Sequence, residues 1–125
     1  TQIIVDHLGI VQPHEPPVPA EPWADLAKVL TVAQFPNVAI KITGACTLSR
    51  EVYPYNDIWD PVCRMIDTFG IERCLWGTDW TRAVAFLTHK QGVDAFRDTK
   101  RLSDSDKVKL MGANTARFYG WSPQR

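Results

Sequence analysis

The chain has 125 residues, of which 45% are hydrophobic and 22% charged, and its 14 Lys and Arg balance its 14 Asp and Glu. This composition is typical of one globular domain, and the balanced charge argues against binding to nucleic acid. The apolar runs are too short to span a membrane, and the first residues do not resemble a signal peptide, so we expect a cytoplasmic protein. The three cysteines include no CxxC pair, which indicates reduced thiols rather than a disulfide framework.

Apolar segments at residues 3–7, 38–43 and 73–79 predict three β-strands, because they are short and rich in β-branched and aromatic residues. Their nearly continuous apolar character favours strands that are buried on both faces of a parallel sheet. Between them, residues 21–35 and 57–70 place apolar side chains at helical spacing. The sequence therefore alternates strand and helix, as parallel α/β proteins do.

Residues 88–99 and 103–120 predict further helices after the third strand, the second with Ser103 as its N-cap and Asp106 in its first turn. The repeated strand–helix pattern predicts right-handed crossover connections.

The loops at residues 9–21 and 44–56 are longer than a strand-to-helix connection requires. Each follows the carboxyl end of a predicted strand, and binding sites of parallel α/β proteins form at that end. We interpret both as candidate ligand-binding loops, with plain surface loops as the alternative.

Polar side chains stand at the predicted strand ends: Asp6 and His7 at the first, Lys41 in the second and Asp79 at the third. A carboxylate in such a poorly hydrated position needs a hydrogen bond, an ion pair or a bound cation. A histidine there can bind a metal or act as a general acid or base. Alternation along a strand places Asp6 and His7 on opposite faces.

Each of these residues also has a structural interpretation. A single histidine after a strand is more often a hydrogen-bonded structural residue, and Asp79 can cap the following helix. Lys41 can reach solvent or pair with a carboxylate. We expect His14 and His89 to be solvated. Cys46 and Cys74 are interpreted as packing residues, with Arg73 as the one adjacent charge.

Four blocks in sequence order are more specific than any single residue: "VDHLG" at 5–9, "PNVAIKITG" at 36–44, "FGIERCLWGTDW" at 69–80 and "NTARFYGW" at 114–121. Together they resemble the amidohydrolase-2 group of the metal-dependent hydrolase superfamily, which includes lactonases and decarboxylases. The resemblance covers essentially the whole chain.

The resemblance implies a TIM (β/α)8 barrel, of which residues 1–125 are the C-terminal part: strands 6–8 with their helices. The N-terminal part of the barrel is expected to be missing from this chain. His7 would lie on strand 6 and Asp79 on strand 8, at the mouth of the barrel. Asp79 would be the general base that takes a proton from water, and His7 would orient that water or polarise the carbonyl.

The same resemblance implies that Asp79 and His7 can bind one divalent metal such as Zn. The His-x-His pair that the family carries on strand 1 is absent from residues 1–125, so a metal site on this chain would be incomplete. In the lactonases, the loop after strand 7 supplies a basic residue for substrate carboxylates. In this chain that loop offers Arg50, with Tyr53 nearby, as candidate substrate-binding residues, and a solvated Arg50 is an equal alternative. Trp80, directly after Asp79, is a further candidate substrate-binding residue.

We therefore expect an amidohydrolase-type hydrolase that acts on a small carboxylated substrate, such as a lactone or a ring-cleavage product. Neither nucleic acid nor a membrane is expected as a partner, and a homo-oligomer stays open. The fragment itself is expected to be inactive, with open sheet edges that favour self-association. The alternatives are a decarboxylase (lyase) of the same family, or a non-catalytic half-barrel module that associates with another chain.

Overall fold

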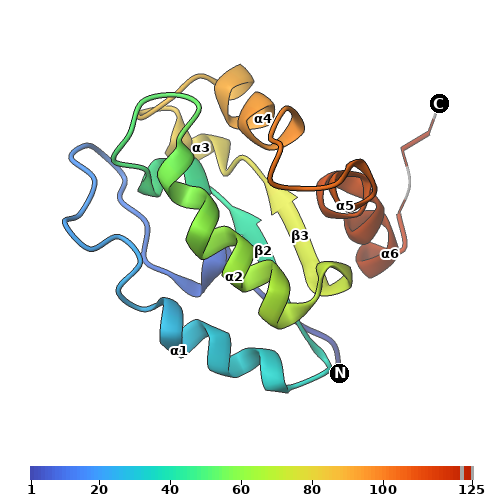
Figure 1. Cartoon of the computed structure of the whole chain (residues 1–125). Helices are drawn as coiled ribbons and strands as arrows, with labels where there is room; N and C mark the ends of the chain where they lie inside the picture. The colour runs from blue at the N-terminus through green and yellow to red at the C-terminus, as the bar shows by residue number, and fades with distance from the viewer. Residues whose placement is uncertain (122, 125) are drawn as a thin grey trace.

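The centre of the protein is a parallel sheet of three strands in the order β1-β2-β3, seen in a computed structural model that describes residues 1–121 and 123–124. Val5 of the first strand lies opposite Ile40, which in turn lies opposite Cys74. The strands are β1 (Ile3–Val5), β2 (Val38–Thr43) and β3 (Cys74–Gly77). The expected α/β class with a parallel sheet is confirmed (Figure 1).

Only the middle strand has the predicted bounds. Residues 38–43 were expected to form a strand and do so, whereas the prediction that the first strand reaches His7 is wrong because the chain leaves the sheet after Val5. Likewise, the third strand ends at Gly77 rather than at Asp79. Both polar residues therefore lie in turns that follow their strands.

Residues 1–121 and 123–124 form six α-helices beside the sheet. They are α1 (Leu26–Thr31), α2 (Trp59–Phe69), α3 (Trp80–Ala83), α4 (His89–Arg97), α5 (Asp104–Val108) and α6 (Asn114–Tyr119). The short helix α3 was not predicted, and α1 is shorter than the expected helix over 21–35. A π-helical turn over Lys109–Ala113 joins α5 to α6, so the expected helix over 103–120 is present but irregular. Ser103 caps α5 as predicted, since its Oγ accepts a hydrogen bond from the amide of Asp106.

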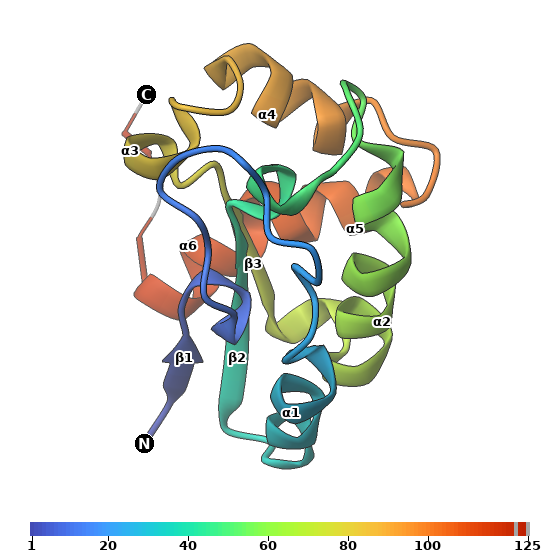
Figure 2. The same cartoon turned by 90° about the vertical axis from the view of Figure 1, so that its left-hand side faces the viewer.

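Two helices cover one face of the sheet, and their contact with β2 forms the core. Figures 1 and 2 show α1 and α2 side by side over this face, with the α5–α6 segment beside β3 at the opposite edge from β1. Ile40 and Ile42 of β2 are fully buried, as are Val62 and Met65 of α2. Burying such side chains contributes roughly 1.5–3 kcal/mol each, so this layer is a substantial source of stability. No helix in the described ranges is long and apolar enough to cross a membrane.

The two long loops lie with α3 and α4 beyond the carboxyl ends of the strands (Figure 2). They contact one another directly, because the Nη1 of Arg50 in the second loop donates to the carbonyl of Ala20 in the first, at 3.2 Å. The end of the sheet that sequence reasoning singled out therefore carries most of the irregular structure.

Arg73 fixes the opposite end of the sheet. Its guanidinium donates to the backbone carbonyls of Phe69, Phe35, Val38 and Ala33, at 2.7 to 3.0 Å. These hydrogen bonds give the Arg73 guanidinium a structural role.

The two buried cysteines behave as packing residues. Burial raises the pKa of the Cys46 thiol to about 12 and that of the Cys74 thiol to about 12, although Arg73 acts in the opposite direction on Cys74. Both thiols are therefore protonated at neutral pH, which agrees with their interpretation from the sequence.

Asn114 joins the C-terminal helix to the sheet. Its side chain is 2% exposed, and its Nδ2 donates to the carbonyls of Ile71 at 2.6 Å and Cys74 at 2.8 Å. Ile71 lies in the turn that precedes β3, and Cys74 is the first residue of that strand. The asparagine of the "NTARFYGW" block thus has a clear structural role.

Replacing Asn114 with Ala is expected to lower the free energy of unfolding by about 1–3 kcal/mol, because two buried carbonyls lose their donor. Chemical denaturation of the whole protein measures the effect. Gln34→Ala is the matched control, since Gln34 also donates to a backbone carbonyl but is exposed. Equal stability of the Asn114 variant and the control would contradict this role.

Candidate active site at the strand ends

The backbone turns into the left-handed region at the end of every strand. The φ angles are 49° at His7 after β1, 71° at Gly44 after β2 and 50° at Asp79 after β3. Glycine adopts such angles freely, but for His7 and Asp79 they cost roughly 1–2 kcal/mol each. Strain of this kind at non-glycine residues concentrates in functional sites.

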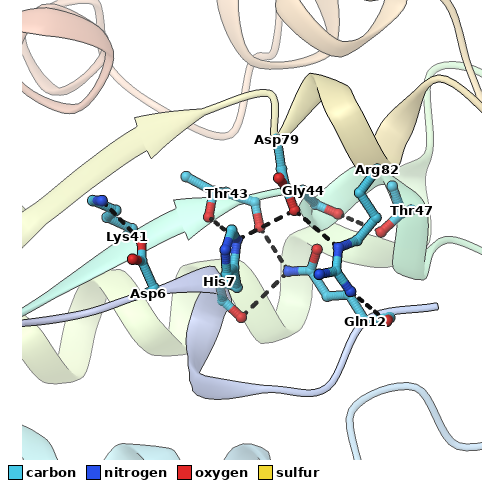
Figure 3. A network of polar contacts seen from close by, with 9 residues as sticks. All are labelled: Asp6, His7, Gln12, Lys41, Thr43, Gly44, Thr47, Asp79 and Arg82. Carbon is cyan, nitrogen blue, oxygen red and sulfur yellow. Dashed lines mark hydrogen bonds and ion pairs between the residues drawn. The ribbon is translucent and has the colours of Figure 1, made fainter. Parts of the chain in front are cut away.

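These turns bring His7 and Asp79 together, as shown in Figure 3. The Nδ1 of His7 lies 3.2 Å from the Oδ2 of Asp79 and 3.2 Å from the Oγ1 of Thr43, so the ends of all three strands meet here. The Asp79 side chain is 11% exposed, whereas that of His7 is 43% exposed. The pair therefore combines a largely buried carboxylate with an imidazole that solvent can reach.

Asp6 makes a separate ion pair. Its Oδ1 lies 2.9 Å from the Nζ of Lys41, and hydrogen bonding to Asp6 raises the pKa of Lys41. Asp6 and His7 have different partners, but Lys41 and Thr43 lie two residues apart on the same face of β2, and Asp6 and His7 line the same cavity. The prediction that they lie on opposite faces is therefore wrong, because the chain leaves the strand after Val5 and alternation no longer applies.

Two residues that sequence reasoning missed complete the network. The Nε of Arg82 lies 3.3 Å from the Oδ2 of Asp79, and its Nη1 donates to the carbonyl of Gln12 at 2.8 Å. The side-chain amide of Gln12 donates in turn to the carbonyls of Thr43 at 2.7 Å and His7 at 3.3 Å. Arg82 stands three residues after Asp79 in the first turn of α3, a spacing that could have revealed it. Nothing in the loop sequence reveals Gln12.

Glycine is required at position 44 for two reasons. Its φ angle is positive, and a Cβ there would stand 2.2 Å from the Oε1 of Gln12 and 3.3 Å from the Cβ of Asp79. Because glycine has no Cβ, the Gln12 side chain can pass close to residue 44, and its amide lies between the ends of β1 and β2.

Among the described residues, the buried side-chain nitrogen and oxygen atoms that lack an aligned hydrogen bond all belong to this network. Within residues 1–121 and 123–124 they are Gln12 Oε1, Asp79 Oδ2 and Arg82 Nε. Arg82 and Asp79 are close enough for an ion pair, but their atoms are not aligned for a hydrogen bond. An unsatisfied buried polar group costs about 1–3 kcal/mol, and its presence in a native protein requires a reason such as catalysis. Asp79 also makes no side-chain cap to α3, so capping does not explain it.

An open cavity of about 390 Å³ lies next to the network. Its polar lining includes Asp6, His7, Gln12 and Arg82. Asp79 is not among the residues that line the cavity, but its Oδ2 lies 3.2 Å from the Nδ1 of His7 and 3.3 Å from the Nε of Arg82. A small molecule in this cavity would meet an imidazole and a guanidinium that share one carboxylate.

The three predicted substrate-binding residues do not line this cavity. Arg50 donates to Ala20, Tyr53 lines a different cavity of about 280 Å³ beside α4, and the ring of Trp80 packs 5.4 Å from that of His89. Their roles in substrate binding stay predictions.

The residues at the site do not by themselves fit a catalytic metal. His7 and Asp79 are suitable donors in kind, and their 3.2 Å separation suits two ligands of one ion. No group of three His, Cys, Asp or Glu residues gathers in the described part of the chain, whereas catalytic zinc sites use three protein ligands. The Nε of Arg82 also lies 3.3 Å from the Oδ2 of Asp79, the carboxylate oxygen that His7 contacts.

Comparison with known proteins agrees with this architecture. Residues 1–121 match the family described as Amidohydrolase, and the chain belongs to that family. The 4-sulfomuconolactone hydrolases are similar in sequence: that of Hydrogenophaga intermedia is 25% identical over 121 residues, and that of Rhizobium radiobacter 34% over 135 residues. These matches cover 94% and 96% of this chain but only 38% and 40% of those proteins. The chain thus spans about two fifths of their length.

Solved structures show the same fold. An amidohydrolase from Burkholderia multivorans superposes with a TM-score of 0.77 at 22% identity, over 97% of this chain and 45% of that one. Amidohydrolase 2 from Bifidobacterium longum subsp. infantis gives a TM-score of 0.61 at 25% identity, over 97% and 41%. A protein assigned as a 2-pyrone-4,6-dicarboxylic acid hydrolase from Pseudomonas putida gives 0.68 at 21% identity, over 98% and 44%.

Gly44→Ala is expected to lower the free energy of unfolding by at least about 1–2 kcal/mol, because alanine is strained at this φ angle and its Cβ displaces Gln12. Gly112→Ala is the control: nothing lies within 4 Å of its Cβ position, and its φ angle is not positive. Thermal and chemical denaturation of both variants test this, and a neutral Gly44→Ala would show that the Gln12 contact is dispensable.

Proposed function

We propose that the protein containing this chain hydrolyses a small lactone that carries a carboxylate or sulfonate group. The observation that carries the proposal is the contact between His7 and the largely buried Asp79 at the strand ends, in a member of the amidohydrolase family. The names of the similar proteins, 4-sulfomuconolactone hydrolase and 2-pyrone-4,6-dicarboxylic acid hydrolase, support an anionic lactone as substrate.

In the proposed mechanism Asp79 is the general base. Its side chain is 11% exposed, and neither His7 nor Arg82 makes an aligned hydrogen bond to it, so the carboxylate is proposed to accept a proton from water. The water oxygen then attacks the lactone carbonyl carbon, and the ring C–O bond breaks. The proton held by Asp79 passes to the departing ring oxygen, which leaves a hydroxy acid.

His7 acts beside this base. Its ring is accessible from the cavity while its Nδ1 stays 3.2 Å from Asp79, so the Nε2 side can orient water or polarise the carbonyl. The strained turn at His7 and its hydrogen-bonding distance to Thr43 hold the ring in place.

We further propose that residues 1–125 form strands 6–8 of a (β/α)8 barrel with their helices. Three parallel strands in sequential order and coverage of about two fifths of related proteins support this arrangement. The remaining site residues would then come from outside residues 1–125, and the fragment alone would be inactive.

A divalent ion such as Zn is proposed only for the whole protein. One Burkholderia multivorans amidohydrolase structure is described with bound Zn, but His7 and Asp79 alone supply too few ligands here. Its remaining ligands would have to come from other parts of the protein.

Asp79→Asn is expected to lower kcat at least about 100-fold, since an amide cannot accept the proton. The readout is hydrolysis of sulfonated and carboxylated lactones by the whole protein, with circular dichroism to verify folding. Asp25→Asn removes the same charge from an exposed ion pair with Lys28 at the start of α1 and serves as the control.

Wild-type activity in the Asn variant would show that Asp79 is not the base. Absence of lactone hydrolysis by the wild-type protein would contradict the proposed function, and release of CO2 from a ring-cleavage product would favour the decarboxylase.

A further inference from the structure

We infer that Arg82 binds the acidic group of the substrate, a carboxylate or a sulfonate, in the cavity that His7 also lines. This inference rests on the proposed function for the identity of the substrate. It concerns a residue that neither the sequence motifs nor the predicted roles of Arg50, Tyr53 and Trp80 point to.

The guanidinium of Arg82 is held in place, but not all of its N–H groups have a hydrogen-bond acceptor. One nitrogen, Nη1, donates to the backbone carbonyl of Gln12 at 2.8 Å, and Nε faces the Oδ2 of Asp79 at 3.3 Å without an aligned hydrogen bond. The remaining nitrogen, Nη2, makes no hydrogen bond to any described residue and is not among the buried unpartnered atoms. Two N–H groups of Nη2 can therefore donate to a ligand.

The cavity directs these donors toward a substrate. Arg82, Gln12 and His7 line the same space of about 390 Å³, large enough for a single-ring molecule. A guanidinium presents its N–H groups in a fixed plane that matches the oxygens of a carboxylate or sulfonate. Because Gln12 fixes the plane, little side-chain entropy is lost when the anion binds.

Among the basic residues near the cavity, Arg82 is the one best placed to bind an anion. Lys41 is already paired with Asp6 at 2.9 Å and does not line the cavity. Arg50, the residue expected to bind a carboxylate, donates to Ala20 and lies outside the cavity lining. An acidic group on Arg82 would leave the rest of the substrate beside His7.

Calorimetric titration with isophthalate, an unreactive planar dicarboxylate, tests the inference on the whole protein. Arg82→Met should weaken binding about tenfold or more, the range expected when a hydrogen bond to a charged group is lost. Arg82→Lys keeps the charge but not the planar donors, so it should bind with intermediate affinity. Arg64→Met is the control, since Arg64 is exposed on α2 and makes no ion pair with any residue that the structure describes.

Three results would overturn the inference: no isophthalate binding by the wild-type protein, unchanged binding by Arg82→Met, or a loss confined to Arg50→Met. Thermal unfolding verifies that each variant folds. The titration needs no turnover, so it remains decisive if the protein proves not to be a lactonase.

A second measurement separates substrate binding from support of Asp79. In Arg82→Met, the ratio of kcat/KM for an anionic lactone to that for a neutral lactone should fall at least about tenfold. If Arg82 only positions Asp79, kcat falls equally for both lactones and the ratio stays constant, which would contradict a direct contact with the acidic group.

Discussion

The arrangement of the site depends on the hydrogen bonds that the side-chain amide of Gln12 donates. It donates to the carbonyl that follows β1 and to the last carbonyl of β2, and so joins two strand ends where the ladder of the sheet has stopped. The backbone carbonyl of Gln12 accepts a hydrogen bond from Arg82, and Arg82 in turn lies beside the carboxylate of Asp79, which follows β3. One loop residue therefore links all three strand ends, and Gly44 makes room for it.

The residues at the carboxyl ends of the strands lower the stability of the fold. Left-handed backbone at His7 and Asp79, together with three buried polar atoms that lack aligned partners, is unfavourable to folding. The packed layer between β2 and α2, together with the hydrogen bonds of Arg73 and Asn114, stabilises the rest of the sheet. This distribution, with a rigid base and a strained rim, is what an enzyme of parallel α/β architecture requires.

The sequence predicts the framework better than the site. Residues 38–43 form a strand within the predicted bounds because almost every side chain there is buried. The family resemblance implied that His7 and Asp79 lie at the same end of the sheet, and in the structure their side chains are 3.2 Å apart. The bounds of β1 could not be predicted, since no local signal marks a left-handed histidine. Gln12 was missed because its partner Thr43 is 31 residues away, and such contacts leave no trace in local patterns.

The central claim is that His7 and Asp79 act as one catalytic unit. A double-mutant cycle on lactone hydrolysis by the whole protein, with His7→Gln, Asp79→Asn and the double variant, tests it most directly. We expect the double variant to be about as slow as the slower single variant, because removing either partner already disables the pair. Independent effects that multiply in the double variant, or full activity without His7, would contradict the account.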